Sequence, residues 1–366
     1  PGTPGGVSTP ESAANPPDFT YAGTVVVDRG AIGFAVPHQR YGFAGEFVDK
    51  EWMEIDRYPE SPCFGNVYVS FTPFHGVGGN SHIRFSRSTD GGASFSNPLP
   101  VNTGGQAGST YNQGSDIAVG PDGAVYVAYI AYPSGGETSA SVRIAKSSDC
   151  GQHWDNPVIA GSLTTVQAPG VVFRTPTFAF TAVDDTNPDT VYVAYQSFEG
   201  GSYNIYTRRS LDGGATWGDA VMVNDDGGTR HQIFPTIETS NGALHVAWYD
   251  FRNSVTAANE ALDVYYACAN CAGVAYPAFS HSERVTDISH NGNCRMFGGG
   301  SSAFHGDYNE LAAIWDGSQH TVHVAWADNR DVPAAECDLD PAVGPPTNNI
   351  GNRNQNIYAD KLLVAP

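Results

Sequence analysis

The stretch that decides the fold occurs three times, as Ser88-Thr-Asp90-Gly-Gly-Ala-Ser-Phe95, Ser147-Ser-Asp149-Cys-Gly-Gln-His-Trp154 and Ser210-Leu-Asp212-Gly-Gly-Ala-Thr-Trp217. A serine, an aspartate, a glycine and an aromatic residue keep the same spacing in all three copies. The aspartates lie 59 and 63 residues apart, and each copy follows a short run typical of a strand. Repetition at such a period predicts a stacked repeat architecture.

A second repeated pattern lies upstream of each copy and marks a buried strand. Its five copies are Asn66-Val-Tyr-Val-Ser70, Ala124-Val-Tyr-Val-Ala128, Thr190-Val-Tyr-Val-Ala194, Ala243-Leu-His-Val-Ala247 and Thr321-Val-His-Val-Ala325. Together the two patterns define a unit of about 60 residues and four strands. A lone four-stranded sheet leaves one face bare, so the units must stack, and radial stacking gives a β-propeller. We predict an all-β propeller of five four-stranded blades, with six blades as the alternative.

The ends of the chain complete this picture. The last unit, which ends near Val364, lacks an outer strand, and Thr24–Asp28 reads as a strand that could supply it and close the ring. Residues 1–18 are rich in proline and glycine and predict a flexible segment. Residues 19–366 are then a single propeller domain.

Composition and charge agree with this architecture and exclude several functions. With 42 glycines and 24 prolines in 366 residues, almost no segment is long enough for a helix. The chain has 38 acidic and 18 basic residues, a net charge of −20, which argues against nucleic-acid partners and anionic membrane surfaces. No apolar run reaches the roughly 18 residues that membrane insertion requires.

The first repeat resembles the Asp box of sialidase-like BNR-repeat proteins. The segments Asp49-Lys-Glu-Trp52, Trp248-Tyr-Asp-Phe-Arg252, Gly306-Asp-Tyr-Asn309 and Trp326-Ala-Asp-Asn-Arg330 are similar to those of secreted bacterial members. The resemblance covers roughly residues 43–366 and implies a propeller, export from the cell and a glycan partner. It also implies that Asp90, Asp149 and Asp212 are structural, because the family's Asp box caps a turn on the face opposite the active site.

The six cysteines favour disulfides over a metal site, because only Cys268 and Cys271 are close in sequence. In the blade scheme, Cys63 and Cys150 lie in turns of adjacent blades on the Asp-box face. Cys294 and Cys337 lie in two long loops of the opposite face. We therefore predict the pairs 63–150, 268–271 and 294–337.

The resemblance also implies where a catalytic site would lie. Sialidases use three arginines for a substrate carboxylate, a tyrosine nucleophile with a glutamate partner, and an aspartate as acid. The corresponding candidates here are Arg174, Arg252 and Arg330 for binding, Tyr308 as nucleophile, Glu310 as its partner, and Asp49 or Asp116 as acid, with Asp307 a further carboxylate. Departures from the family pattern are the place of Arg174 in the third blade and Thr175 after it.

Each candidate also has a purely structural interpretation. Arg252 and Arg330 stand two residues after Asp250 and Asp328 and could simply pair with them. Tyr308 could be a core aromatic residue with a satisfied hydroxyl.

Metals and cofactors have little support in the sequence. His231 and His305 enter first strands on the functional face, but one histidine per loop is weak support for a metal or an acid–base pair. Acidic stretches such as Asp338-Leu-Asp340 offer oxygen ligands to a structural calcium ion, without a recognised spacing. We predict that no cofactor is required.

Two functions fit these features. One is a secreted sialidase-like glycoside hydrolase acting at the central face of the propeller. The other is a non-catalytic propeller that binds carbohydrate or protein, or serves as an extracellular assembly module. Fold alone does not separate them.

Overall fold

The computed structural model describes residues 23–35, 43–75, 80–101, 111–132, 139–227, 230–297, 302–332 and 355–366. Within these ranges the regular structure is β-strand, and no helix long and apolar enough to cross a membrane is found there. The strands, in chain order, are β1 (Ala31–Ala35), β2 (Phe43–Ile55), β3 (Val67–His75), β4 (Asn80–Ser81), β5 (Arg84–Ser88), β6 (Leu99–Pro100), β7 (Tyr111–Val119), β8 (Val125–Tyr132), β9 (Ser139–Ser147), β10 (Val158–Thr164), β11 (Phe180–Val183), β12 (Val191–Glu199), β13 (Ser202–Ser210), β14 (Val221–Met222), β15 (Gln232–Ser240), β16 (Ala243–Asp250), β17 (Asp263–Ala269), β18 (Glu283–Arg284), β19 (Arg295–Phe297), β20 (Ser302–Ala303), β21 (Glu310–Trp315), β22 (His320–Asp328) and β23 (Asn356–Val364).

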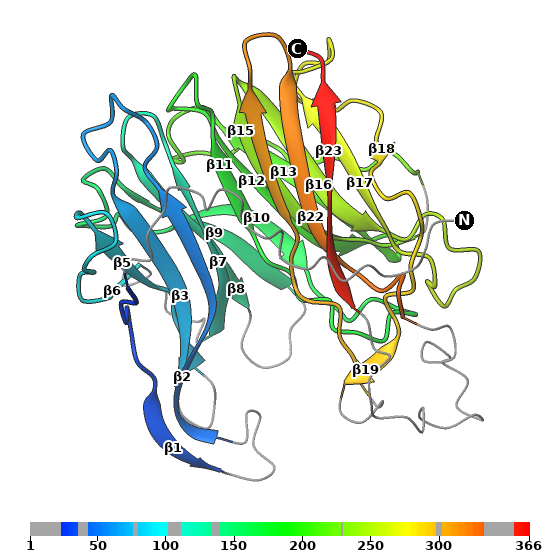
Figure 1. Ribbon diagram of the computed structural model, residues 1–366, viewed down its shortest axis with the longest axis horizontal. Coiled ribbons are helices and arrows are strands. Elements are labelled where there is room, and N and C mark those ends of the chain that lie inside the picture. The colour runs from blue at the N-terminus through cyan, green and yellow to red at the C-terminus, as the bar shows by residue number, and fades with distance from the viewer. Residues whose placement is uncertain are drawn as a thin grey trace, which may run out of the picture.

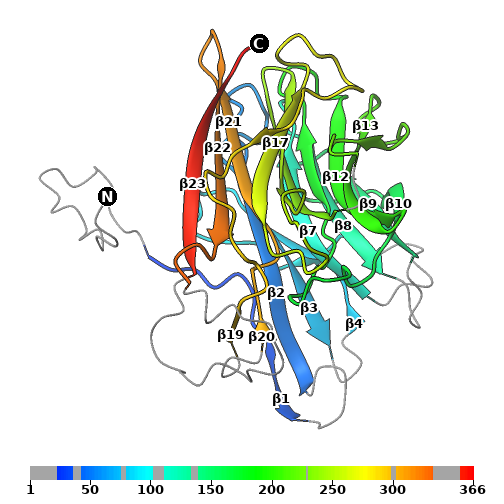
Figure 2. The same ribbon diagram turned by 90° about the vertical axis from the view of Figure 1, so that its right-hand side faces the viewer.

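The strands form antiparallel units that stand side by side (Figures 1 and 2). Four units have four strands each, in the orders β2-β3-β5-β6, β7-β8-β9-β10, β11-β12-β13-β14 and β15-β16-β17-β18. A fifth, β21-β22-β23, has three described strands. The first two units are joined into one larger sheet by a parallel bridge between Ser81 of β4 and Tyr111 of β7. This all-β arrangement is that of a multi-blade propeller.

Hydrophobic side chains fill the space between neighbouring units. Tyr126 of β8 packs with Val193 of β12, and Tyr249 of β16 packs with Val322 of β22 in corresponding clusters. The second strand of each middle unit is buried along almost its whole length, which explains why the Val-x-Val-Ala pattern is apolar without alternation. The predicted stacking of units is therefore the packing that forms the core.

The predicted closing strand is not formed in the described structure. Thr24–Asp28 has no strand assignment, and Asp28 instead forms an ion pair with Arg84 of β5, with a distance of 3.0 Å between Oδ2 and Nη1. Apolar side chains of the first and last units are exposed, Met53 of β2 and Ile314 of β21 among them. The number of blades and the closure of the ring remain predictions. Residues 1–18 lie outside the described residues.

The Asp boxes form compact turns held by local hydrogen bonds. In the third copy, the Ser210 hydroxyl donates to Asp212 Oδ1 at 2.7 Å, and the Thr216 amide donates to the same oxygen at 2.8 Å. The Gly214 amide, where φ is +88°, donates to the Ser210 hydroxyl. The first two copies repeat these bonds around their own serine and aspartate. Each aspartate thus satisfies backbone donors of its turn.

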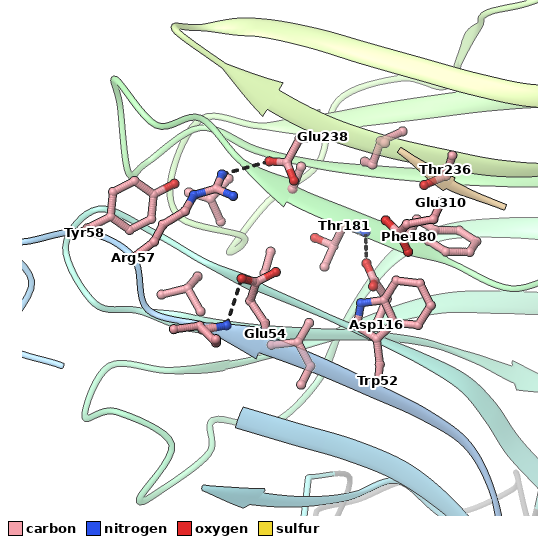
Figure 3. Close-up of a pocket in the computed structure, with 17 residues that line it drawn as sticks. Trp52, Glu54, Arg57, Tyr58, Asp116, Phe180, Thr181, Thr236, Glu238 and Glu310 are labelled. Carbon is pink, nitrogen blue, oxygen red and sulfur yellow. Dashed lines mark hydrogen bonds and ion pairs between the residues drawn. The ribbon is translucent and has the colours of Figure 1, made fainter. Parts of the chain in front are cut away.

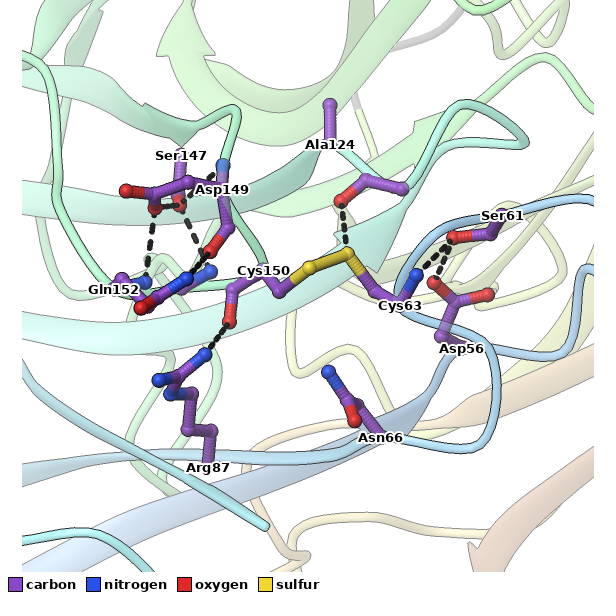
Figure 4. Close-up of a disulfide and its surroundings, with 12 residues drawn as sticks. Asp56, Ser61, Cys63, Asn66, Arg87, Ala124, Ser147, Asp149, Cys150 and Gln152 are labelled. Carbon is purple, nitrogen blue, oxygen red and sulfur yellow. Dashed lines mark hydrogen bonds between the residues drawn. A yellow bond between two sulfur atoms is a disulfide. The ribbon is translucent and has the colours of Figure 1, made fainter. Parts of the chain in front are cut away.

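Two of the three predicted disulfides are present, Cys63–Cys150 and Cys268–Cys271. Figure 4 shows Cys63–Cys150 next to the second Asp box, where it ties the first unit to the second. The third predicted pair includes Cys337, which lies outside the described residues.

We expect the two disulfides to differ in their effect on stability. The loop-entropy relation gives about 4.6 kcal/mol for the 87-residue separation of Cys63 and Cys150, and about 2 kcal/mol for Cys268 and Cys271. Urea unfolding of the two double-serine variants, followed by tryptophan fluorescence, measures both losses. Equal losses, or a larger loss for the 268–271 variant, would show that loop length does not govern the effect.

Candidate functional site

A shared register places one residue from each first strand at the same level. Each of these residues pairs with the last residue of the second repeated pattern on the neighbouring strand. The set is Trp52, Asp116, Phe180, Thr236 and Glu310. All five line one narrow cavity of about 50 Å³, enough for one or two water molecules. The first strands of all five units therefore surround a common axis. The five residues are called the axial ring below.

Figure 3 shows Asp116 and Glu310 near one end of this cavity and the pair of Arg57 and Glu238 at the other. Arg57 Nη2 lies 3.0 Å from Glu238 Oε1. Burial raises the pKa of Glu238, and Arg57 partly opposes that rise. Glu54 also lines the cavity, and its pKa is likewise raised by burial. The axis is thus rich in carboxyl groups that water solvates poorly.

The two carboxyl groups of the axial ring hold protons more tightly than free side chains. Asp116 is buried, and its Oδ2 accepts a hydrogen bond of 2.6 Å from the Thr181 amide. Burial raises the pKa of Asp116 well above its usual value. Glu310 is solvent accessible but enclosed by the cavity wall, and this enclosure raises its pKa to about 7. Glu310 can therefore exchange a proton at neutral pH.

Glu310 also borders a second, open pocket of about 480 Å³. Its other lining residues are Glu51, Trp52, Met53, Glu54 and Val69. The volume suits one or two sugar rings, and the walls combine an indole with carboxyl groups. Glu310 thus stands between the axial cavity and a space that a ligand can enter.

Lys50 is a candidate site residue that the sequence analysis did not name. Its side chain is buried, with Nζ 4.1 Å from the centre of the Trp52 indole and 4.4 Å from that of the Tyr308 ring. No hydrogen-bond partner for Nζ is found among the described residues. Burial lowers the pKa of Lys50 to about 8, and the charges of Asp116 and Glu310 oppose that shift.

Tyr308 lies at the edge of this cluster and is 42% exposed. Its ring meets Trp52 edge to face, with 5.8 Å between centroids. Partial burial, followed by the carboxylates of Glu51 and Asp307, raises the pKa of Tyr308. No hydrogen bond joins the Tyr308 hydroxyl to Glu310 in the described structure. The surroundings therefore disfavour the phenolate form of Tyr308 that a nucleophile needs. They leave its aromatic ring partly exposed to solvent.

Arg174 reaches the same region through a carboxylate. Its guanidinium makes a two-point contact with Asp307, with Nε 2.7 Å from Oδ1 and Nη2 against Oδ2. The guanidinium is largely exposed, whereas the Asp307 carboxylate is shielded. Asp49 belongs to the same acidic group, because its charge raises the pKa of both Asp307 and Tyr308. The structure thus brings Tyr308, Glu310, Asp49, Asp116 and Arg174 into one region.

Arg252 and Arg330 lie elsewhere and have local partners. Arg252 Nη2 lies 2.8 Å from Asp250 Oδ2, and Arg330 Nη2 lies 2.8 Å from Asp328 Oδ2. Each arginine also contacts an aspartate from another loop and lies over a tyrosine ring. Neither lines the axial cavity or the open pocket. The geometry favours the structural interpretation of these two residues.

The two candidate histidines are buried, and their ring nitrogens form hydrogen bonds within the protein. His231 Nδ1 accepts from the Tyr203 amide at 3.1 Å. His305 Nε2 lies 3.1 Å from Nε2 of His290, and burial lowers the pKa of His305 well below its usual value. Across the described ranges no group of three or more histidine, cysteine, aspartate or glutamate side chains could hold a metal ion. The acidic stretch around Asp338 lies outside the described residues.

Comparison with known proteins supports the fold. No family model matches the sequence, and a search of curated proteins finds no relative, so the sialidase-like family stays a prediction. An α-L-arabinanase of Penicillium chrysogenum complexed with arabinobiose is 15% identical, with a TM-score of 0.51, over 80% of this chain and 78% of that chain. The GH93 α-L-arabinofuranosidase of Fusarium graminearum, also with arabinobiose, is 13% identical, with a TM-score of 0.51, over 81% and 80%.

A Hadza microbial sialidase is 14% identical over 76% of this chain and 53% of that chain, with a TM-score of 0.47. At these identities a likeness shows the fold alone, and activity must be argued from the site.

Removing Arg330 should be far more harmful to stability than removing Arg174. Arg330→Met leaves the fully buried carboxylate of Asp328 without its guanidinium, which costs about 3–5 kcal/mol. Arg174→Met removes an ion pair whose guanidinium is largely exposed, worth about 0–1 kcal/mol. Thermal and urea unfolding of the two variants measure the difference. A loss below about 1 kcal/mol in Arg330→Met would show that the pair is not structural and restore Arg330 as a binding candidate.

Proposed function

We propose that the protein is an exported glycoside hydrolase that acts on neutral glycans at the open pocket beside the axial ring. The observation that carries this proposal is the position of Glu310. Its carboxyl group borders an open pocket and lies among aromatic and acidic side chains, and enclosure by the cavity wall raises its pKa to about 7. A carboxylic acid of this kind can protonate the leaving oxygen of a glycosidic bond.

The remaining residues have roles that follow from their positions. Trp52 and Tyr308 offer adjacent aromatic surfaces for a sugar ring. Hydrolysis of a glycoside usually needs a second carboxylate, and the candidates are Glu51, Asp307 and Asp49, in the order of their electrostatic influence on Tyr308. Arg174 keeps Asp307 ionised and oriented through its two-point contact. Asp116 is too buried to reach a ligand and contributes to the acidic field.

A neutral substrate fits this site better than the anionic sugar that the sequence suggested. Arg252 and Arg330 are held by other aspartates, and Arg174 is held by Asp307. The residues around Glu310 and Tyr308 are mainly carboxylates, which repel a substrate carboxylate. Two proteins of similar fold were solved with arabinobiose, a neutral disaccharide, so arabinan oligosaccharides are the first neutral glycans to test.

The alternative is a glycan-binding propeller without catalysis. The same aromatic rings and pocket would serve it, and the disulfides would suit an extracellular location in either case. The experiments below separate the two functions. A protein that only binds glycan keeps its affinity when Glu310 cannot donate a proton, whereas a hydrolase loses its activity.

We expect hydrolysis of neutral glycans, arabinan oligosaccharides first, and no hydrolysis of sialyl-glycans. The active form carries a proton on Glu310, so kcat should fall above about pH 7. Glu310→Gln should lower kcat about 10²–10⁴-fold. The loss should be much smaller on dinitrophenyl glycosides, whose leaving group needs no proton.

Glu283→Gln, at an exposed position on β18, is the matched control and should retain full activity. Binding of arabinobiose by calorimetry without turnover of any substrate in the panel would support the binding module instead.

Tyr308 separates the aromatic-surface role from the nucleophile role. If its ring only supports the sugar, Tyr308→Phe should keep kcat within about threefold, whereas Tyr308→Ala should raise KM about tenfold or more through lost stacking. Steady-state kinetics of both variants on one arabino-oligosaccharide provide the test. Loss of turnover in Tyr308→Phe with unchanged folding would instead identify Tyr308 as the nucleophile.

A further inference from the structure

Lys50 occupies a position that the fold does not require to be charged. The first strands β2, β7 and β15 each contain a bulge just before the axial ring. The residues at the equivalent point are Lys50, Gly114 and Phe234, all with φ between 52° and 73°. Two of the three bulges are therefore built without a charged side chain. A non-glycine residue in this conformation is strained, and such strain is often retained for function.

The environment of the Lys50 ammonium is energetically unfavourable, which suggests that the charge is retained for function. Nζ is surrounded by aromatic rings, with the centroids of Phe178 and Phe180 at 5.5 and 5.7 Å in addition to Trp52 and Tyr308. A buried ammonium without hydrogen bonds is costly, and cation–π contacts recover only part of that cost. An apolar side chain would fit the same cage at lower cost.

We propose that Lys50 is a positioning residue, which holds the Trp52 and Tyr308 rings at the open pocket and supplies the positive charge that lets Glu310 give up its proton. This inference rests on the proposed function, because it assigns a role toward Glu310. It goes beyond that function by adding a residue that touches no substrate.

The charges around Lys50 come from several strands. Asp49 and Glu51 flank it on β2, Asp116 comes from β7, Asp307 precedes β21, and Glu310 begins it. From the β11 side only the apolar Phe178 and Phe180 face it. The carboxyl groups of Asp116, Glu310, Glu51 and Asp307 all act electrostatically on Lys50. Its positive charge lowers the pKa of Glu310, opposing the effect of burial.

The sign of the effect follows directly. With Lys50 charged, Glu310 loses its proton near pH 7. When Lys50 is replaced by an uncharged residue, the negative neighbours are no longer balanced, and Glu310 should hold its proton to a higher pH. The fall in activity at alkaline pH should then move upward in Lys50→Met. Lys50→Arg keeps the charge and should leave that limb in place.

The test uses NMR, so it does not depend on activity. The chain has three lysines, Lys50, Lys146 and Lys361, so ¹³Cε-lysine labelling gives three signals that single variants assign. Lys50 should titrate near pH 8. Carboxyl ¹³C signals of labelled glutamate, assigned by Glu310→Gln, should show Glu310 shifted upward by roughly 1 pH unit in Lys50→Met.

Lys146→Met is the matched control, because Lys146 also lies over a tyrosine ring, 5.3 Å from the centroid of Tyr126, but its Nζ lies beside Gly213 in the third Asp-box turn. It should leave the Glu310 titration unchanged. If Lys50→Met does not fold, the wild-type Glu310 signal alone decides, since deprotonation of Lys50 near pH 8 should give it a second, smaller step.

An unchanged Glu310 titration in folded Lys50→Met, or a Lys50 signal that titrates above about pH 10, as a free lysine does, would overturn the proposal. A coupled titration in a protein that hydrolyses no glycan would overturn the proposed function and leave the role of Lys50 toward Glu310 intact.

Discussion

The structure depends on the packing of one four-stranded sheet against the next through strands that are apolar on both faces. Val125, Val191 and Val246 are fully buried members of such strands in three consecutive units. Because a side chain must fit the same gap in each unit, the units share one register, and that register fixes what each first strand presents to the axis. The chemistry of the site is therefore a consequence of how the sheets pack.

The axis concentrates charge in a place where water is scarce. Asp116 and Glu310 occupy equivalent positions in two units, and Lys50 is brought beside them by a bulge in a third. Poor solvation raises the pKa of both acids and lowers that of the base, so all three groups move toward neutral pH. Such a convergence is typical of functional sites. The aromatic rings of Trp52 and Tyr308 complete a surface that suits a sugar.

The repeats were sufficient to predict the all-β units and the pairing of Cys63 with Cys150, because both follow from where turns fall in a repeated sheet. Closure of the ring stays a prediction, because Thr24–Asp28 has no strand assignment and Asp28 pairs with Arg84 of the first unit. Tyr308 and Glu310 could be named from a resemblance, but Lys50 could not. In the sequence, a lysine between two acidic residues indicates an exposed charged segment. Only the bulge in β2 places the Lys50 side chain in the interior, and the bulge depends on strand pairing.

The central claim is that a neutral glycan binds at the wall where Glu310 meets the open pocket. A crystal structure of the Glu310→Gln variant soaked with arabinobiose tests it most directly, because slow turnover preserves the ligand. The account predicts a sugar ring against Trp52 and Tyr308, with its glycosidic oxygen within hydrogen-bonding distance of the side-chain amide that replaces the Glu310 carboxyl group. Sugar bound elsewhere on the propeller, or an empty pocket at a ligand concentration that saturates the protein in solution, would contradict it.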